Sequence, residues 1–258
     1  MRNKKNVCFP SIGFFVCLVL IVGFISALSP CGCNMSNSMV RAKMTAVGVR
    51  GRDIYVAIVT ANTERESLGL PPIWPSDAPP YTNHVTGCVE CFDFDNSTDY
   101  FAYIFDEANY GTDNWKPLVS GFDYGKLAGA GVKAHSGVGP LVAENNMWTI
   151  AKNVTEEMED VIPILITRNL DPAYLLSEVK RKPASSRIPL GETWENPFSN
   201  KGAVLIRKGG GLFMFRAKYA TPQVIYNVQS AYVIKAGSKY PLKYLTPNKE
   251  VVPVGKTN

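Results

Sequence analysis

The sequence of 258 residues has little of what most catalytic and metal-binding proteins use. It holds two histidines, which excludes a metal site built from several imidazoles. The glycine-rich stretches Gly129-Ala-Gly131 and Lys208-Gly-Gly-Gly lack the spacing of a dinucleotide or phosphate loop, so we expect ordinary turns there. Repeats and low-complexity tracts are absent. Apolar residues nevertheless make up 46% of the chain, enough for a folded core.

Charge is unevenly distributed along the chain. Residues 41–199 contain 14 basic and 21 acidic side chains, whereas residues 200–258 contain 10 basic and one acidic. A nucleic-acid-binding protein that is basic throughout its body is therefore excluded, and we expect no nucleic-acid partner. The basic segment either lies against the acidic one within a subunit or meets the acidic face of the next subunit, in an open head-to-tail assembly.

The amino terminus lacks charge over a long stretch, from Asn6 to Val40. Residues 1–11 form a basic leader, and residues 12–30 are predicted to cross the membrane. The apolar centre, Ile12–Leu28, has 17 residues against the roughly 20 of a typical spanning helix. The anchor residues would be Phe15, Leu18, Val19, Leu20, Ile21, Val22, Phe24 and Ile25.

Two other interpretations of this segment stay open. A signal peptide cleaved after Ile25-Ser26-Ala27 fits the basic start and the apolar run, although Pro30 follows closely. A lipoprotein would use Cys31, but proline directly precedes it. In all three cases the basic leader stays cytoplasmic and the rest of the chain is exported.

The pattern of apolar residues after the anchor predicts an amphipathic helix over residues 39–69. Apolar residues recur near 3.6-residue spacing from Met39 to Leu68, at Val40, Met44, Val47, Ile54, Ile58 and Ala61. Gly69 suits the position after the helix end, and Pro71-Pro72 prevent continuation.

Residues 70–258 are predicted to form an exported α+β domain. Asn96 and Asp99 mark a helix start with a buried stripe at Phe101, Ile104 and Phe105, and Asp171-Pro172 starts another. Strands are expected at Met147–Ala151, Val161–Thr167, Ala203–Arg207, Leu212–Tyr219, Val224–Val228 and Tyr232–Lys235. Because the elements do not alternate regularly as βαβ, we expect the α+β class. A long amino-terminal helix, in which the membrane segment continues into the amphipathic helix, would pack on a mainly antiparallel sheet.

The amino-terminal sequence resembles that of a known protein family. The order of features is similar to the prepilin-like segment of type II secretion pseudopilins and type IV pilins. These features are the basic residues, Gly13-Phe14, an apolar run that ends in Ala27-Leu28-Ser29-Pro30, and Arg41-Ala42-Lys43 on the helix. Downstream stretches resemble large pseudopilin-like proteins of the Lentisphaerae type, namely Gly51–Ile58, Ala61–Glu66, Ser97–Phe101, Asn145–Trp148 and Ile166–Asn169.

The resemblance implies a function. A leader peptidase would cut between Gly13 and Phe14, and the apolar half of the helix would pack with other pilin-like subunits and secretion-system components. The family has Glu at the fifth position after the cut, where this chain has Leu18. The expected protein is a non-enzymatic, single-pass subunit of a bacterial inner membrane, with its carboxyl-terminal domain in the periplasm. The alternative is an exported enzyme or ligand-binding module with a cleaved signal or simple signal anchor.

The remaining candidate sites are weak. Cys88 and Cys91 would form a disulfide in an oxidising compartment, would join Cys31 and Cys33 around zinc, or would be free thiols. The acidic group Asp93, Asp95, Asn96 and Asp99 lacks the pattern of a calcium loop and fits a helix cap better. His135-Ser136 lacks the surroundings of a nucleophile. We therefore predict no metal, no cofactor and no catalytic residue.

Overall fold

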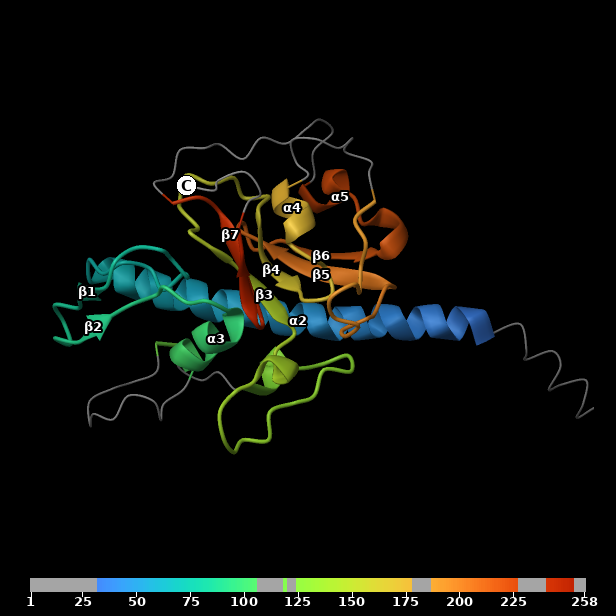
Figure 1. The fold of residues 1–258 in the computed structure, drawn as a ribbon, viewed down its shortest axis with the longest axis horizontal. Helices are drawn as coiled ribbons and strands as arrows, with labels where there is room; N and C mark the ends of the chain where they lie inside the picture. Colours follow the sequence, from blue (N-terminus) through green and yellow to red (C-terminus); the bar gives the residue numbers. More distant parts are fainter. Residues whose placement is uncertain (1–31, 106–117, 120–123, 178–186, 227–239, 253–258) are drawn as a thin grey trace, which may run out of the picture. The chain divides into compact units, whose positions relative to one another are not determined.

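The computed structural model describes residues 32–105, 118–119, 124–177, 187–226 and 240–252 (Figure 1). The chain divides into two compact units, residues 1–42 and 43–258. All strands among the described residues belong to the second unit.

Helix α2 (Gly32–Ser67) is the long helix that the sequence predicts, and it begins seven residues before Met39. Residues 34–38 contain neither glycine nor proline, so no helix breaker lies between Cys33 and Met39. In the second unit its buried stripe contains Met44, Val47, Ile54, Ile58 and Ala61, as predicted. The end is also confirmed: Gly69 has φ of 68°, and the Leu70 N–H donates to the Arg65 carbonyl at 2.9 Å, which closes the last turn.

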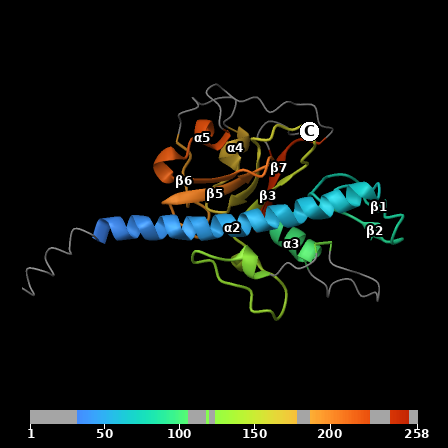
Figure 2. The same cartoon turned by 180° about the vertical axis from the view of Figure 1, so that it is seen from behind.

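The core of the second unit is a six-stranded antiparallel sheet in the order β6-β5-β4-β3-β7-β8. The strands are β3 (Trp148–Lys152), β4 (Pro163–Thr167), β5 (Gly202–Arg207), β6 (Leu212–Arg216), β7 (Lys243–Thr246) and β8 (Lys249–Val251). Every residue of β3, β4 and β5 is buried, because elements cover both faces of the sheet. Figures 1 and 2 show α2 crossing it, with the short helices α4 (Ala173–Ser177) and α5 (Pro222–Tyr226) on the other side. The α+β class with a mainly antiparallel sheet is confirmed.

Two glycines bring α2 close to the sheet. A Cβ atom on Gly51 would lie 2.4 Å from Cη2 of Trp148, whose side chain is fully buried. On Gly48 it would lie 2.8 Å from a methyl carbon of Leu212. A side chain at either position would therefore require its neighbours to shift. At Gly51, the indole of Trp148 fills the space that a side chain would occupy.

Smaller elements surround this core. A two-stranded ribbon, β1 (Tyr81–Thr82) and β2 (Val89–Glu90), follows α2. Helix α3 (Ser97–Phe105) begins where predicted: the Asn96 side chain accepts a hydrogen bond from the Asp99 N–H at 2.8 Å. Three single turns complete the described elements: η3 (Tyr124–Leu127), η4 (Ala143–Asn145) and η5 (Ala217–Tyr219).

Two predicted strands need correction. Residues 224–226 of the expected strand Val224–Val228 belong instead to helix α5 (Pro222–Tyr226), and residues 227–228 lie outside the described residues. The reason is a cap that the apolar run concealed: Thr221 accepts from the Val224 and Ile225 N–H groups, and Pro222 occupies the first helical position. The expected strand Leu212–Tyr219 is shorter: β6 ends at Arg216, and residues 217–219 form η5. Tyr232–Lys235 lies outside the described residues.

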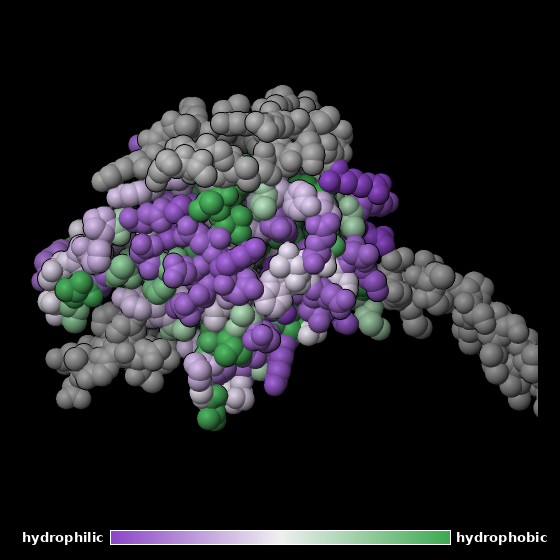
Figure 3. Space-filling model, in the orientation of Figure 1, coloured by the Kyte–Doolittle hydropathy of each residue, from purple (hydrophilic) through white to green (hydrophobic). Residues whose placement is uncertain are grey.

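The predicted membrane segment, residues 12–30, also lies outside the described residues. Within the described ranges, none of the helices is both long and apolar enough to cross a membrane. On the face of the second unit in Figure 3, hydrophilic residues predominate and the hydrophobic ones form separate spots. Such a surface suits contact with water.

Candidate functional site: a buried lysine among three carboxylates

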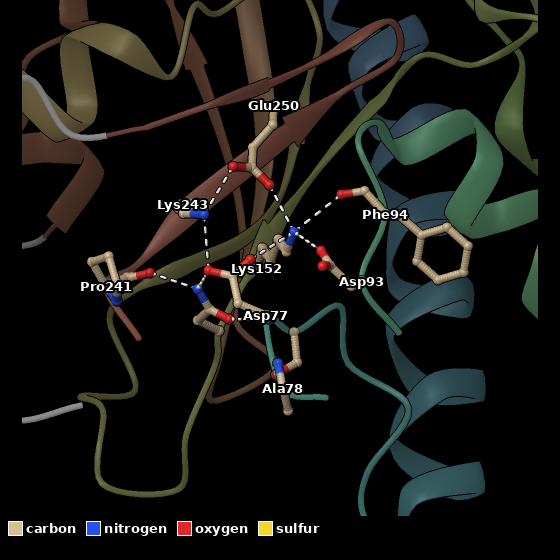
Figure 4. Close-up of polar contacts among 10 residues, drawn as sticks. Asp77, Ala78, Asp93, Phe94, Lys152, Pro241, Lys243 and Glu250 are labelled. Carbon is tan, nitrogen blue, oxygen red and sulfur yellow. Dashed lines mark hydrogen bonds and ion pairs between the residues drawn. The ribbon is translucent and has the colours of Figure 1, made fainter. Parts of the chain in front are cut away.

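The most concentrated group of charges in the described residues surrounds the ammonium of Lys152 (Figure 4). Its side chain is 1% exposed, at the end of β3. The ammonium lies 2.5 Å from Asp93 Oδ1, 2.7 Å from Glu250 Oε2 and 2.8 Å from Asp77 Oδ1. It also donates to the Phe94 carbonyl at 3.1 Å. A buried charge needs such partners, because desolvation without them costs several kcal/mol.

A second lysine completes the group. Lys243 on β7 lies directly opposite Lys152 in the antiparallel pairing, where two like charges would repel. Its ammonium contacts Asp77 Oδ2 at 2.8 Å and Glu250 Oε1 at 2.9 Å, so the two carboxylates bridge the two lysines. We call these five residues, Asp77, Asp93, Lys152, Lys243 and Glu250, the lysine cluster.

An asparagine fixes the position of Asp77. Asn153 follows β3 with φ of 66°, a backbone conformation that asparagine tolerates better than most residues. Its amide donates to Asp77 Oδ2 at 2.9 Å and to the Pro241 carbonyl at 2.7 Å, and its Oδ1 accepts from the Asp77 N–H at 2.8 Å. The loop after α2 is thereby joined to the end of β3 and to the chain that enters β7.

The charges of Lys152 and Asp77 are fixed near neutral pH. Burial acts to lower the pKa of Lys152, but the three carboxylates outweigh it and raise the pKa above its ordinary value. Burial acts to raise the pKa of Asp77, yet hydrogen bonds from Lys152, Lys243 and Asn153 lower it to about 2. Groups held in one protonation state are poor general acids or bases near pH 7. The arrangement therefore suits a structural role.

The three carboxylates also lie close enough together to hold a metal ion. However, the Lys152 ammonium already occupies the place between them, at hydrogen-bond distance from all three. A cation would have to displace a buried lysine that has no other anionic partner in the described residues. The lysine cluster is thus an ion-pair network in which the Lys152 ammonium takes the position that a metal ion would need.

A second buried network holds the β1–β2 ribbon. Arg65, in the last turn of α2, contacts Glu90 Oε2 at 2.6 Å, and both side chains are almost fully buried. Glu90 also accepts from Asn83 at 2.7 Å and from the Tyr81 hydroxyl. Burial acts to raise the pKa of Glu90, but Arg65, Tyr81 and Asn83 bring the pKa below its usual value. The network ties the end of α2 to the loop that follows it.

The structure separates the acidic residues that the sequence groups together. Asp93 turns toward Lys152, whereas Asn96 and Asp99 cap α3 through a side-chain contact of 2.7 Å. Asp95 is exposed. The helix-cap interpretation is confirmed for Asn96 and Asp99, while the role of Asp93 was missed. The signal was a lysine at the end of a buried strand, since a buried ammonium requires a counter-charge from elsewhere in the fold.

Cys88 and Cys91 are half-buried free thiols in the structure. The two residues between them form strand β2, and three steps along an extended chain span about 10 Å. A disulfide needs Cα atoms within about 7 Å of each other, so forming one would bend β2. The disulfide between Cys88 and Cys91 stays a prediction, and its formation would require a change in the backbone of β2.

The other candidate residues have ordinary positions or lie outside the described ranges. The His135 ring contacts the backbone of its own loop, with Nε2 3.0 Å from the Gly139 carbonyl and Nδ1 accepting from the Gly137 N–H, and so does not face Ser136. The suspected cleavage site, Gly13 and Phe14, and all the anchor residues lie outside the described residues. No family model, curated protein or solved structure matches the chain.

Proposed function

We propose that the protein is a membrane-anchored, pseudopilin-like structural subunit with an exported domain. The observation that carries the proposal is the order of its parts: an uncharged apolar run, then a 36-residue helix, then an antiparallel sheet that shares the second unit with residues 43–67 of that helix.

The charged networks support a structural role for the domain. The lysine cluster and the Arg65–Glu90 pair join segments far apart in the sequence to the helix and the sheet. The partners would be the lipid bilayer and other pilin-like subunits, and the location would be a bacterial inner membrane with the domain in the periplasm. We propose no enzymatic activity.

Carbonate extraction of membranes tests the anchor. The wild-type chain should stay in the membrane pellet. Replacing Val19 and Val22 by Arg should release it or block insertion, because each central charge costs about 2.5–3.5 kcal/mol. Replacing Val49 and Val56, which are exposed on α2 outside the anchor, by Arg is the matched control and should leave the chain in the pellet. Wild-type protein in the soluble fraction would overturn the proposal.

A further inference from the structure

The loop between β3 and β4 carries four exposed acidic residues within five positions, which we call the acidic turn: Glu156, Glu157, Glu159 and Asp160. The acidic turn lies against the hairpin turn after β5, because the Gly209 N–H donates to the Asp160 carbonyl at 3.0 Å. Among the described residues, one basic side chain reaches it: the Lys208 ammonium lies 3.7 Å from Asp160 Oδ1 and donates to the Glu156 carbonyl at 2.9 Å. The acidic turn therefore keeps a net negative charge at its surface.

Three exposed lysines lie at the other end of β5, and we call them the basic end: Lys43, Lys201 and Lys218. Lys201 directly precedes β5, and its carbonyl accepts from the Ala217 N–H at 3.0 Å, which brings the next residue, Lys218, to the same end. Lys43 directly precedes Met44, whose side chain lies against Gly202, the first residue of β5. In the sequence, the acidic residue nearest to Lys201 is Glu195, six positions earlier.

The acidic turn and the basic end are too far apart to pair within one copy. The six residues of β5 separate them by about 17–20 Å, at about 3.3 Å per residue. Helix α2 gives the same separation: Met44 lies against Gly202, whereas the Tyr55 hydroxyl, eleven residues later, donates to the Lys208 carbonyl. Eleven residues of α-helix rise by about 16 Å. An ion pair needs about 4 Å or less, so an internal contact between these two groups is excluded.

We infer that the chain associates head to tail with a second copy of itself, with the acidic turn of one copy against the basic end of the next. A second copy complements both surfaces at once, whereas an anionic lipid surface would complement the basic end alone. Opposed patches of unlike charge steer encounter and fix the register of a contact. Because the two surfaces differ, each contact leaves one of each kind available, and the copies form an open chain. The role of this contact in an assembly of subunits rests on the proposed function, while the contact itself involves residues of the second unit.

Carbodiimide coupling of the full chain tests the contact, because this reagent joins a carboxylate to an amine that touches it. Chains with natural isotopes and chains labelled with nitrogen-15 are mixed in a non-ionic detergent, coupled and digested for mass spectrometry. Peptides that join the acidic turn to Lys43, Lys201 or Lys218 should combine the two isotopes, which shows that two copies supply them. Their yield should fall several-fold in about 1 M salt, where the Debye length is about 3 Å. Links between these sites that never combine the isotopes, or no such links, would overturn the inference.

An exchange of charges sharpens the test, with self-association measured by sedimentation velocity. Lys201→Glu with Lys218→Glu should abolish the association of the full chain, and so should Glu157→Lys with Glu159→Lys. A chain with all four changes has reversed but complementary surfaces and should associate again. Lys133→Glu with Lys249→Glu is the matched control, since both lysines are exposed outside the basic end, and should preserve association.

The possible outcomes separate this contact from the proposed function. A four-change chain that stays monomeric, although its melting temperature matches that of the wild type, would overturn the contact. Loss of association on lysine reversal alone, with no effect of glutamate reversal, would identify another partner such as lipid headgroups and would also overturn it. A monomeric wild-type chain that resists carbonate extraction would overturn the contact and leave the anchor intact. A chain that associates as expected but is released by carbonate would keep the contact and overturn the anchored subunit.

Discussion

The contact between α2 and the sheet differs in kind from the lysine cluster at the end of β3. The first is apolar and depends on close approach, with Gly51 over the buried indole of Trp148. The second is ionic and joins residues from two loops and three strands. The helix contact comes from one regular repeat along the chain, whereas the cluster needs the whole fold to assemble it. The two should therefore respond to different perturbations.

Removing the central lysine should have the largest effect. Lys152→Met would leave three carboxylates around an uncharged side chain, and breaking a buried ionic network costs about 3–5 kcal/mol. We expect the melting temperature in thermal unfolding to fall by roughly 10 °C. Lys126→Met is the control, since its contact with Asp53 is exposed, at 3.4 Å, and should cost at most about 1 kcal/mol. Equal losses in the two variants would show that the lysine cluster does not brace the domain.

Alanine at Gly51 should have the next largest effect. The new methyl group would lie 2.4 Å from a fully buried indole, and such overpacking costs about 1–3 kcal/mol. Gly48→Ala meets the flexible end of Leu212 instead. Both changes gain about 1 kcal/mol in helix propensity, which should offset most of the strain at Gly48 but less of it at Gly51. Chemical denaturation measures both variants, and a Gly51→Ala protein as stable as Gly48→Ala would contradict the close approach of helix and indole.

Acid should weaken the ionic contacts selectively and by the smallest amount. The pKa of Asp77 is about 2 in the folded chain and about 3.9 in an unfolded one. Between these values the unfolded state binds more protons, so the stability that Asp77 contributes is complete above about pH 4 and is lost as pH falls toward 2. We expect Asp77 to account for about 1–2 kcal/mol, after allowing for solvent screening, with a further loss from Glu90. Unfolding free energies measured from pH 6 to pH 2.5 should fall less steeply for Asp77→Asn, and an unchanged slope would count against this role.

The same comparison explains how far the sequence predicts the fold. Periodicity found the buried face of α2, because apolar residues three and four apart share a helix face. The hairpin around Lys208–Gly211 and the cap at Asn96 were also predictable, since both are local. Helix α5 was mistaken for a strand because five residues are too few to show a period, and the Thr221-Pro222 cap was overlooked.

The lysine cluster could be predicted only in part. A lysine at the end of a buried strand signals that a counter-charge is needed, but its partners are 59 to 98 residues away. Strands β7 and β8, which supply Lys243 and Glu250, are short and were not predicted. Which acid reaches Lys152 depends on the sheet order, and local patterns carry no information about that order.

Amino-terminal sequencing of the mature protein tests the central claim most directly. We predict a chain that begins at Phe14, with the anchor residues from Phe15 to Ile25 retained. A chain that begins at Leu28 would have lost the anchor and would contradict the membrane-anchored subunit.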